Sequence, residues 1–233
     1  MNIALFKTVG NYAEMLDKIA VSTFIVLIFC IYQIIYHVSF FHSALSKYLM
    51  EFNLWGIKIP MSVFIISIVL AFISRSIKLH DRLSDLFKIR DKYDLFQILY
   101  PLAMGTTNKL SPNSLFEIKS KRKDLMNKCF YKYASSKDTN PLVDKHLITM
   151  AIDQLSWFWV VIESIFFLFV TSTVFIFVGQ PVESLIFIII ANVLLLLCIP
   201  LLELCKGYTK DEVEAILNSQ EAKTEIEGIF NAL

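Results

Sequence analysis

Four long apolar stretches separated by polar links dominate the pattern of hydrophobic and polar positions along this chain. They run from Ala20 to Phe41, from Ile59 to Ile77, from Leu155 to Val178 and from Glu183 to Leu204. A helix needs about 20 mostly apolar residues to cross the roughly 30 Å hydrocarbon core of a bilayer. The pattern therefore predicts an all-α integral membrane protein with four transmembrane helices arranged as two hairpins.

Lysine and arginine are placed unevenly around these stretches. Fifteen of the 22 fall between Arg75 and Gln154, whereas the Ser43–Lys58 link holds two and the Gly179–Ser184 turn holds none. Positively charged loops stay on the cytoplasmic side of a membrane. We therefore expect a multi-pass membrane protein with the middle segment and both termini in the cytoplasm.

The alternation of apolar and charged segments predicts four domains. Residues 1–77 form an N-terminal segment and the first transmembrane hairpin, and residues 78–154 form a cytoplasmic helical segment. Residues 155–204 form the second hairpin, and residues 205–233 form an acidic cytoplasmic helical tail. The middle segment and the tail together predict a helical layer on the cytoplasmic side.

Helical periodicity continues beyond the second apolar stretch. Apolar residues at Leu79, Leu83, Leu86 and Phe87 follow the i, i+4, i+7, i+8 spacing of an amphipathic helix. We expect this helix to extend the second span into the cytoplasm without a break. A helical pattern also resumes at Leu142 and is expected to run directly into the third span.

Two capping boxes indicate further helix starts, SLFE at Ser114–Glu117 and TKDE at Thr209–Glu212. In this motif a Ser or Thr side chain accepts a bond from the amide three residues on, and the Glu side chain returns one. We therefore expect one helix to begin at Ser114 and another at Thr209.

The tail combines a negative charge balance with an apolar set at Ile226, Ile229, Phe230 and Leu233. The middle segment has a positive balance, so charge complementarity would assist contact between the two. These features predict that the tail docks on the middle segment. A loosely attached tail is the alternative.

Residues that could carry catalysis or bind a metal form no recognisable pattern. The cysteines Cys30, Cys129, Cys198 and Cys205 form no CxxC pair. The sequence has no Gly-rich phosphate loop, no GxSxG nucleophile motif and no zinc-protease motif. We therefore expect no enzyme activity, no catalytic residue, no metal site and no cofactor.

Glu163 lies about eight residues into the third predicted span. An ionisable residue at such depth is costly and faces protein or water, so Glu163 is a candidate pore-lining or interhelix residue. It is interfacial if the helix enters the bilayer later. Arg75 is its candidate basic partner, with Lys78 as a competitor. Asn192 and Gln33, in the fourth and first spans, are candidates for hydrogen bonds between helices.

The densest basic cluster consists of Lys119, Lys121, Arg122, Lys123 and Lys128. It is a candidate contact for a partner or for anionic headgroups, where each Lys or Arg is worth about 1 kcal/mol. Nucleic acid is a further candidate ligand. The remaining interpretation is a solvated helix face.

Four stretches of the chain resemble the small membrane effectors encoded beside reverse transcriptases in bacterial retron antiphage systems. The stretches are HDRLSDLFKIRDKYD (His80–Asp94), ILYPLA (Ile98–Ala103), KCFYKYASS (Lys128–Ser136) and DKHLITMAIDQLSWFW (Asp144–Trp159). They cover about one fifth of the chain and contain no motif with a chemical role. The resemblance therefore implies no functional residue.

The resemblance implies an antiphage defence effector of the inner membrane, which becomes toxic on release from a partner complex by permeabilising or depolarising the membrane. The expected partners are membrane lipid, further copies of the chain, and a soluble cytoplasmic protein or a reverse transcriptase–nucleic acid complex. Two other classes stay open: a non-toxic membrane anchor or scaffold for a soluble partner, and a small channel or transporter subunit. The sequence pattern shows no broken helices, which weighs against a transporter.

Overall fold

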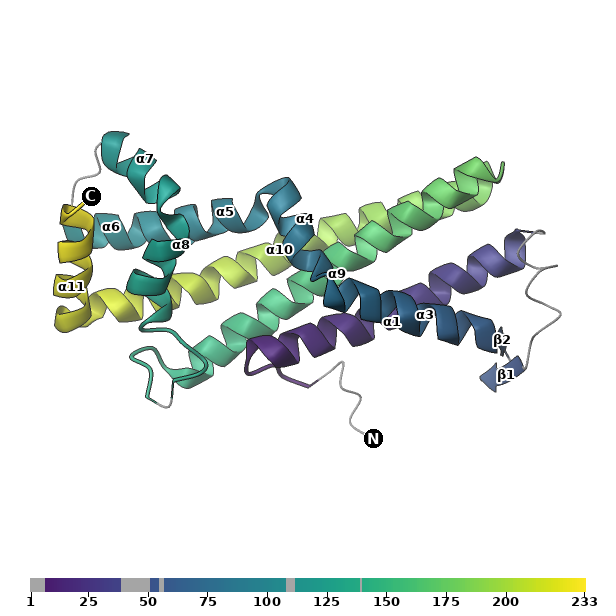
Figure 1. Ribbon diagram of the computed structural model, residues 1–233, viewed down its shortest axis with the longest axis horizontal. Helices are drawn as coiled ribbons and strands as arrows, with labels where there is room; N and C mark the ends of the chain where they lie inside the picture. The colour runs from purple at the N-terminus through teal and green to yellow at the C-terminus, as the bar shows by residue number, and fades with distance from the viewer. Residues whose placement is uncertain (1–6, 39–50, 55–56, 108–111, 139) are drawn as a thin grey trace. The chain divides into compact units, whose positions relative to one another are not determined.

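The computed structural model describes residues 7–38, 51–54, 57–107, 112–138 and 140–233. Figure 1 shows that these residues are almost wholly helical. They fall into two compact units. Unit 1 contains Leu16–His80 and Ser156–Leu201, and unit 2 contains Thr8–Met15, Asp81–Leu155 and Leu202–Leu233.

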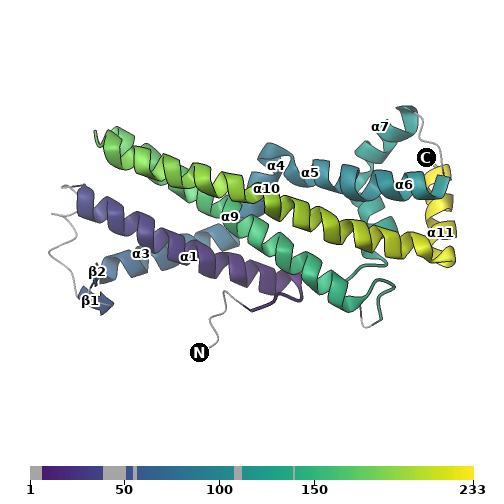
Figure 2. The same ribbon diagram turned by 180° about the vertical axis from the view of Figure 1, so that it is seen from behind.

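Unit 1 is an apolar helical bundle with a short hairpin. It contains most of α1 (Tyr12–His37), strands β1 (Glu51–Leu54) and β2 (Ile57–Pro60), α3 (Met61–Ser76), and the greater parts of α9 (Lys145–Phe177) and α10 (Pro181–Asn218). Leu27 and Ile31 of α1 pack in one cluster with Val63 and Ala71 of α3, and Phe167 of α9 packs against it. Figure 2 shows α1 and α3 side by side.

The turn between α9 and α10 is tight and has a defined hydrogen-bond pattern. Gly179 adopts φ of +75°, a left-handed conformation that glycine adopts at little cost. The N–H of Gln180 donates to the carbonyl of Phe175, and the N–H of Gly179 donates to Ile176, which is the Schellman arrangement at a helix end. Phe175 also stacks on Phe187, so α9 and α10 form an antiparallel hairpin.

Among the described residues, three helices, α1, α9 and α10, are long and apolar enough to cross a membrane. The second predicted span is different, because α3 ends at Ser76 after only 16 residues. It counts as a fourth candidate only when α3 and α4 (Leu79–Phe87), bent by 57° at their junction, are taken together as one broken span. Long apolar helices of this kind are compatible with membrane insertion.

The expectation that the second apolar helix continues without a break is wrong. The helix is interrupted at Ile77 and Lys78, and Lys78 has a φ of 51°. A side chain with a Cβ atom rarely adopts this left-handed conformation, and it cannot continue a right-handed helix. The spacing of apolar residues gave no sign of the break, because the helical spacing before Ile77 continues after Lys78.

The link before α3 contains a β-hairpin that the all-helical expectation missed. Strands β1 and β2 pair antiparallel, with Phe52 opposite Ile59 and Asn53 opposite Lys58. Each strand has only four residues, which is too short for the period-2 alternation of a strand to stand out in a sequence.

Unit 2 is a layer of short helices. It contains most of α4, then α5 (Ile89–Tyr93), the π-helical segment η3 (Asp94–Leu99), α6 (Tyr100–Thr107), α7 (Pro112–Ser120), α8 (Arg122–Leu125), the π-helical segment η4 (Met126–Tyr131), the first part of α9, the last part of α10, and α11 (Gln220–Asn231). Its core is apolar and closed, and its fully buried members include Leu99, Leu102, Ile118, Leu125, Ile148, Ile216 and Ile226.

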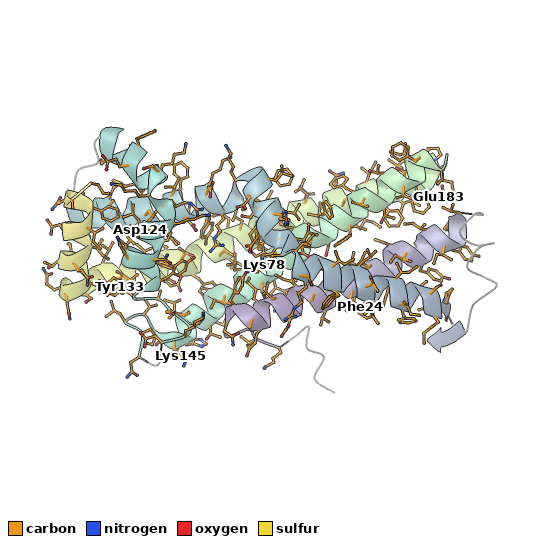
Figure 3. The ribbon with its side chains drawn as sticks, viewed as in Figure 1. Phe24, Lys78, Asp124, Tyr133, Lys145 and Glu183 are labelled. Carbon is orange, nitrogen blue, oxygen red and sulfur yellow. The ribbon has the colours of Figure 1, made fainter. Side chains whose placement is uncertain are left out.

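The docking of the tail on the middle segment is confirmed. Ile226 and Phe230 of α11 are buried in the core of unit 2, and Ile229 and Leu233 pack against it. Figure 1 shows α11 beside α6, which it contacts more than any other element. Tyr133, labelled in Figure 3, donates to Glu225 of α11 over 2.8 Å.

Gly105 of α6 leaves room for a side chain from the last part of α10. A Cβ atom added at Gly105 would lie 2.6 Å from Cδ1 of Leu217. Such a distance is closer than real contacts allow, so either Leu217 or α6 would have to move.

Both capping-box predictions are wrong. Helix α7 begins at Pro112, ahead of Ser114, and α10 runs without interruption through Thr209. The cap of the tail helix is Ser219 instead, whose side chain accepts from the N–H of Ala222. The long helix leading into the third apolar stretch is present as α9, which begins at Lys145, just after Asp144.

Candidate functional site: a buried carboxylate beside a helix break

Glu163 is the most enclosed acidic side chain among those of unit 1 whose burial the structure describes. It lies on α9 and is only 2% exposed. A carboxylate removed from water is stable only where hydrogen-bond donors replace its hydration. The donors around Glu163 therefore decide what this residue does.

Three donors from three other helices, α1, α3 and α4, meet the Glu163 carboxylate. The hydroxyls of Thr23 on α1 and Ser74 on α3 donate to Oε2 over 2.9 and 3.1 Å. The backbone N–H of His80 donates to Oε1 over 3.0 Å. Bonds to a charged acceptor are stronger than neutral ones. We call these four residues the Glu163 latch.

The His80 bond explains how the break between α3 and α4 is stabilised. His80 is the second residue of α4, and the first four N–H groups of a helix have no acceptor within that helix. The Glu163 carboxylate supplies one from α9, and a negative charge at a helix N-terminus is favourable in itself. Figure 3 labels Lys78 at this break.

The imidazole of His80 belongs to the same enclosed environment. Its Nδ1 lies 3.6 Å from Oε1 of Glu163, and both side chains are almost fully buried. The ring centroid lies 5.9 Å from that of Trp159, which is one turn before Glu163 on α9. His80 therefore contacts Glu163 through both its backbone N–H and its ring.

Arg75 is not the partner of Glu163. Its guanidinium pairs with Asp17 of α1 over 2.5 Å, and both side chains are largely exposed, at 44% and 63%. The expected pairing of Arg75 with Glu163 is therefore wrong. The carboxylate is bonded by two hydroxyls and a backbone N–H instead. Ion pairs this exposed contribute little to stability.

Asn192 and Gln33 lie elsewhere in unit 1. Asn192 is exposed on α10, where its Nδ2 donates to the carbonyl of Ile188 over 2.8 Å. Gln33 is half-buried on α1. Neither belongs to the Glu163 latch.

The basic cluster of unit 2 divides into two kinds of residue. Lys119, Lys121, Lys123 and Lys128 are exposed. Lys121 pairs with Glu117 and Lys128 with Asp124, in each case four residues earlier in the chain. The four lysine side chains are therefore accessible to a partner or a headgroup.

Arg122 of the same cluster is turned inward. Its side chain is only 11% exposed and bonds to Asp94 and, over 2.7 Å, to Asp91. Burial raises the pKa of Asp94, while Arg122 and Arg90 oppose that rise. Arg122 is therefore a structural cation of unit 2.

A charged groove of about 340 Å³ opens beside this network. Its charged lining residues are Asp81, Asp85, Arg90, Asp94, Arg122 and Lys123. Three acids and three bases balance, so the groove favours neither an anion nor a cation. Segments η3 and η4 both contribute to it, and the sequence pattern did not indicate these π-helical turns, which often occur at functional sites.

Glu212 is a further buried acid, in the part of α10 that belongs to unit 2. It is nearly fully buried, and this burial raises its pKa to about 8. Thr209, one turn earlier, is also buried and shares a 2.8 Å hydrogen bond with Tyr93. Both residues of the predicted capping box are thus interior residues.

No metal centre emerges from the described part of the chain, where no three His, Cys, Asp or Glu side chains gather as ligands. The described cysteines are all buried and free. The main polar feature is the Glu163 latch, whose four residues are buried within the apolar bundle of unit 1.

A family model described as the YmfE protein family matches residues 11–231. The chain belongs to the YmfE family. It is 26% identical over 168 residues to the uncharacterized protein YmfE of Escherichia coli strain K12, a match that covers 68% of this chain and 67% of that protein. No solved structure matches. Because the YmfE relative is itself uncharacterized, the functional argument rests on geometry.

Proposed function

We propose that the chain is a multi-pass protein of the bacterial inner membrane with four spans and both termini in the cytoplasm. Support comes from α1, α9 and α10, which are each long and apolar enough to cross a bilayer. The α3–α4 pair is then the fourth span, broken at Ile77 and Lys78. The gathering of Lys and Arg between Arg75 and Gln154 supports this orientation.

In that membrane the chain acts as a defence effector. It permeabilises or depolarises the membrane once a cytoplasmic partner no longer restrains it. The observation that carries this proposal is the Glu163 latch. Ionisable residues inside a membrane bundle tend to mark ion paths and switches. Broken spans whose half-helix ends face a charged group recur in membrane transport proteins.

The latch suggests how a resting state is held. While the His80 N–H is bonded to Glu163, the start of α4 is tied to α9. If the break opens, this N–H leaves the carboxylate and water must replace it. Water that enters at the open break then gives ions a hydrated path through the bundle. This action needs no catalytic residue and no cofactor.

The restraining partner would act on unit 2. Lys119, Lys121, Lys123 and Lys128 give it four exposed basic side chains. A soluble acidic protein or a nucleic acid-containing complex fits such a surface, and so do anionic headgroups.

A non-toxic anchor for a soluble partner is the second candidate. The pairing of Glu163 favours it, because three donors satisfy the carboxylate as a purely structural role requires. In that case the bundle only holds unit 2 at the membrane, and the latch stabilises its fold.

Controlled expression separates the two candidates. The full chain is induced by itself in bacteria while a potential-sensitive dye is recorded. An effector causes loss of the membrane potential within the induction period, and an anchor leaves the potential unchanged at the same membrane-bound amount. Reporter fusions after Leu233 and after Ser135 should both read cytoplasmic, and a periplasmic signal at either position contradicts the four-span layout.

A further inference from the structure

Helix α10 has two different faces within unit 1. One face is buried through Ser184, Phe187, Ala191 and Cys198. Most of the remaining apolar segment is at the surface. Only 17% of the most apolar window of α10 is buried, against 44% for α9 and 39% for α1. Among these three candidate spans, α10 therefore offers the most apolar surface to its surroundings.

Five exposed residues follow one line along α10, on the side away from the buried face. They are Leu185, Ile189, Asn192, Leu196 and Ile199, and we call them the α10 stripe. Their spacings are four, three, four and three residues. This is the heptad pattern with which two helices pack along a shared seam.

Asn192, at the centre of the stripe, distinguishes a protein contact from a lipid contact. One N–H of its carboxamide donates to Ile188 on its own helix. The side chain also has a second N–H and a carbonyl oxygen, and it is exposed. Hydrocarbon tails can pair with neither group. Amide side chains of this kind form hydrogen bonds between membrane helices.

A second copy of the chain supplies the missing partner. Copies inserted with the same orientation bring their α10 helices together in parallel, so the two Asn192 side chains meet at the same depth. Each carboxamide both donates and accepts, so the pair can bond reciprocally across a two-fold axis. The apolar members of the stripe then pack on either side of it.

The charge pattern of α10 fits a seam that ends near Ile199. The next position of the same heptad line is Glu203, which is exposed and pairs with Lys206 over 2.6 Å. Charged residues at the end of an apolar stripe are expected where a helix leaves the hydrocarbon.

We infer that the α10 stripe is the contact between copies of this chain in the membrane, with paired Asn192 side chains fixing its register. The inference rests on the membrane insertion in the proposed function, and it deepens that proposal by naming the surface through which the protein assembles.

Cysteine cross-linking in native membranes tests the contact. One variant carries Ile189→Cys, on the stripe, and the matched variant carries Ile186→Cys, an exposed apolar position off the stripe. Disulfides form only where the two Cα atoms approach to about 7 Å or less. Mild oxidation should therefore give a disulfide-linked dimer from Ile189→Cys well above the level from Ile186→Cys and from the unaltered chain. Equal yields from both positions overturn the inference.

The role of Asn192 is tested in the Ile189→Cys background. Adding Asn192→Leu should lower the cross-linked fraction about tenfold, the scale expected for a hydrogen bond between membrane helices. Thr173→Val is the matched control, because Thr173 is also exposed and bonds to the carbonyl four residues before it. The control should cross-link like its parent. A dimer fraction unaffected by Asn192→Leu overturns the assigned role.

The same membranes distinguish this inference from the proposed function. Stripe-specific cross-links without loss of membrane potential support the contact and contradict the effector. Loss of potential without stripe-specific cross-links overturns the contact and supports the effector. A chain that alkaline carbonate extracts from the membrane contradicts both.

Discussion

The backbone N–H of His80 donates to the carboxylate of Glu163 over 3.0 Å, although 83 residues separate them along the chain. The bond joins the first turn of α4 to the middle of α9. It gives the helix break at Ile77 and Lys78 an acceptor where water is largely excluded. A buried acid and a broken helix, which look like two separate anomalies, are thus one structural feature.

Removing the Glu163 carboxylate should destabilise the protein. Glu163→Ala leaves the His80 N–H and the hydroxyls of Thr23 and Ser74 without their shared acceptor, which should cost about 2 to 4 kcal/mol. Glu163→Gln keeps one carbonyl oxygen for His80, and both hydroxyls can turn to accept from its amide, so the loss should be smaller. In detergent, the thermal unfolding temperature should fall in the order wild type, Glu163→Gln, Glu163→Ala.

Glu183→Gln is the matched control for these variants, because Glu183 lies outside the latch, in the first turn of α10, and its contact is a part-exposed one of 3.7 Å with His37. Its loss should cost about 0 to 1 kcal/mol, well below the cost of Glu163→Ala. If Glu163→Ala unfolds at the same temperature as the Glu183→Gln control, the Glu163 carboxylate is not a stabilising acceptor.

Arg75→Gln should have little effect on stability. The Arg75–Asp17 pair is largely exposed, and exposed pairs contribute about 0 to 1 kcal/mol. Membrane-bound yield and unfolding temperature should match the wild type. A loss as large as that of Glu163→Ala would show that Arg75, rather than the two hydroxyls, supports the carboxylate.

The fold was predictable wherever apolar runs are long. Helices α1, α9 and α10 coincide with three of the four stretches, because 20 or more apolar residues leave few alternatives. The break at Lys78 was not predictable, since lysine does not mark a left-handed conformation as glycine does. The TKDE box failed for a related reason: Thr209 and Glu212 are interior residues, and the tertiary packing of unit 2 overrides their capping preference.

Gly105→Ala should weaken the packing of the last part of α10 on α6. The added methyl overlaps Cδ1 of Leu217, and overpacking of this kind costs about 1 to 3 kcal/mol. Limited proteolysis should then release the tail sooner than in the wild type. Leu217→Ala removes the overlapping atoms, so Gly105→Ala with Leu217→Ala should resist the protease better than Gly105→Ala with native Leu217. The absence of such a rescue would mean that the two side chains do not meet.

The stability of unit 2 should fall as pH rises from about 4.5 to about 8. Burial raises the pKa of Glu212 from 4.5 to about 8, so the folded state holds a proton that the unfolded state has released in this range. Folding then binds a proton, and stability decreases with pH until the folded pKa is passed. Urea unfolding at pH 5 and pH 8 measures the difference.

Glu212→Gln removes the titrating group and should flatten this pH dependence. Glu214→Gln, an exposed neighbour on the same helix, should keep the wild-type slope. Equal slopes in both variants would assign the pH dependence to other groups.

The site was predictable in part. Glu163 stood out because a carboxylate is rare within an apolar stretch, and its burial agrees with that signal. Its partners were not predictable, because hydroxyls such as Thr23 and Ser74 are ordinary in membrane helices and a backbone N–H has no sequence signature. The nearest cation along the chain suggested Arg75, but partner choice depends on the spatial approach of α1, α3 and α9.

The membrane potential of cells that express Glu163→Gln tests the central claim most directly. This variant removes the negative charge at the start of α4 while keeping the side-chain shape, so the resting latch should be weaker by about 1 kcal/mol. The dye should report depolarisation at a lower membrane-bound amount than for the wild type, with Glu183→Gln matching the wild type. Depolarisation of Glu163→Gln at the wild-type amount, at a higher amount or not at all would contradict the account.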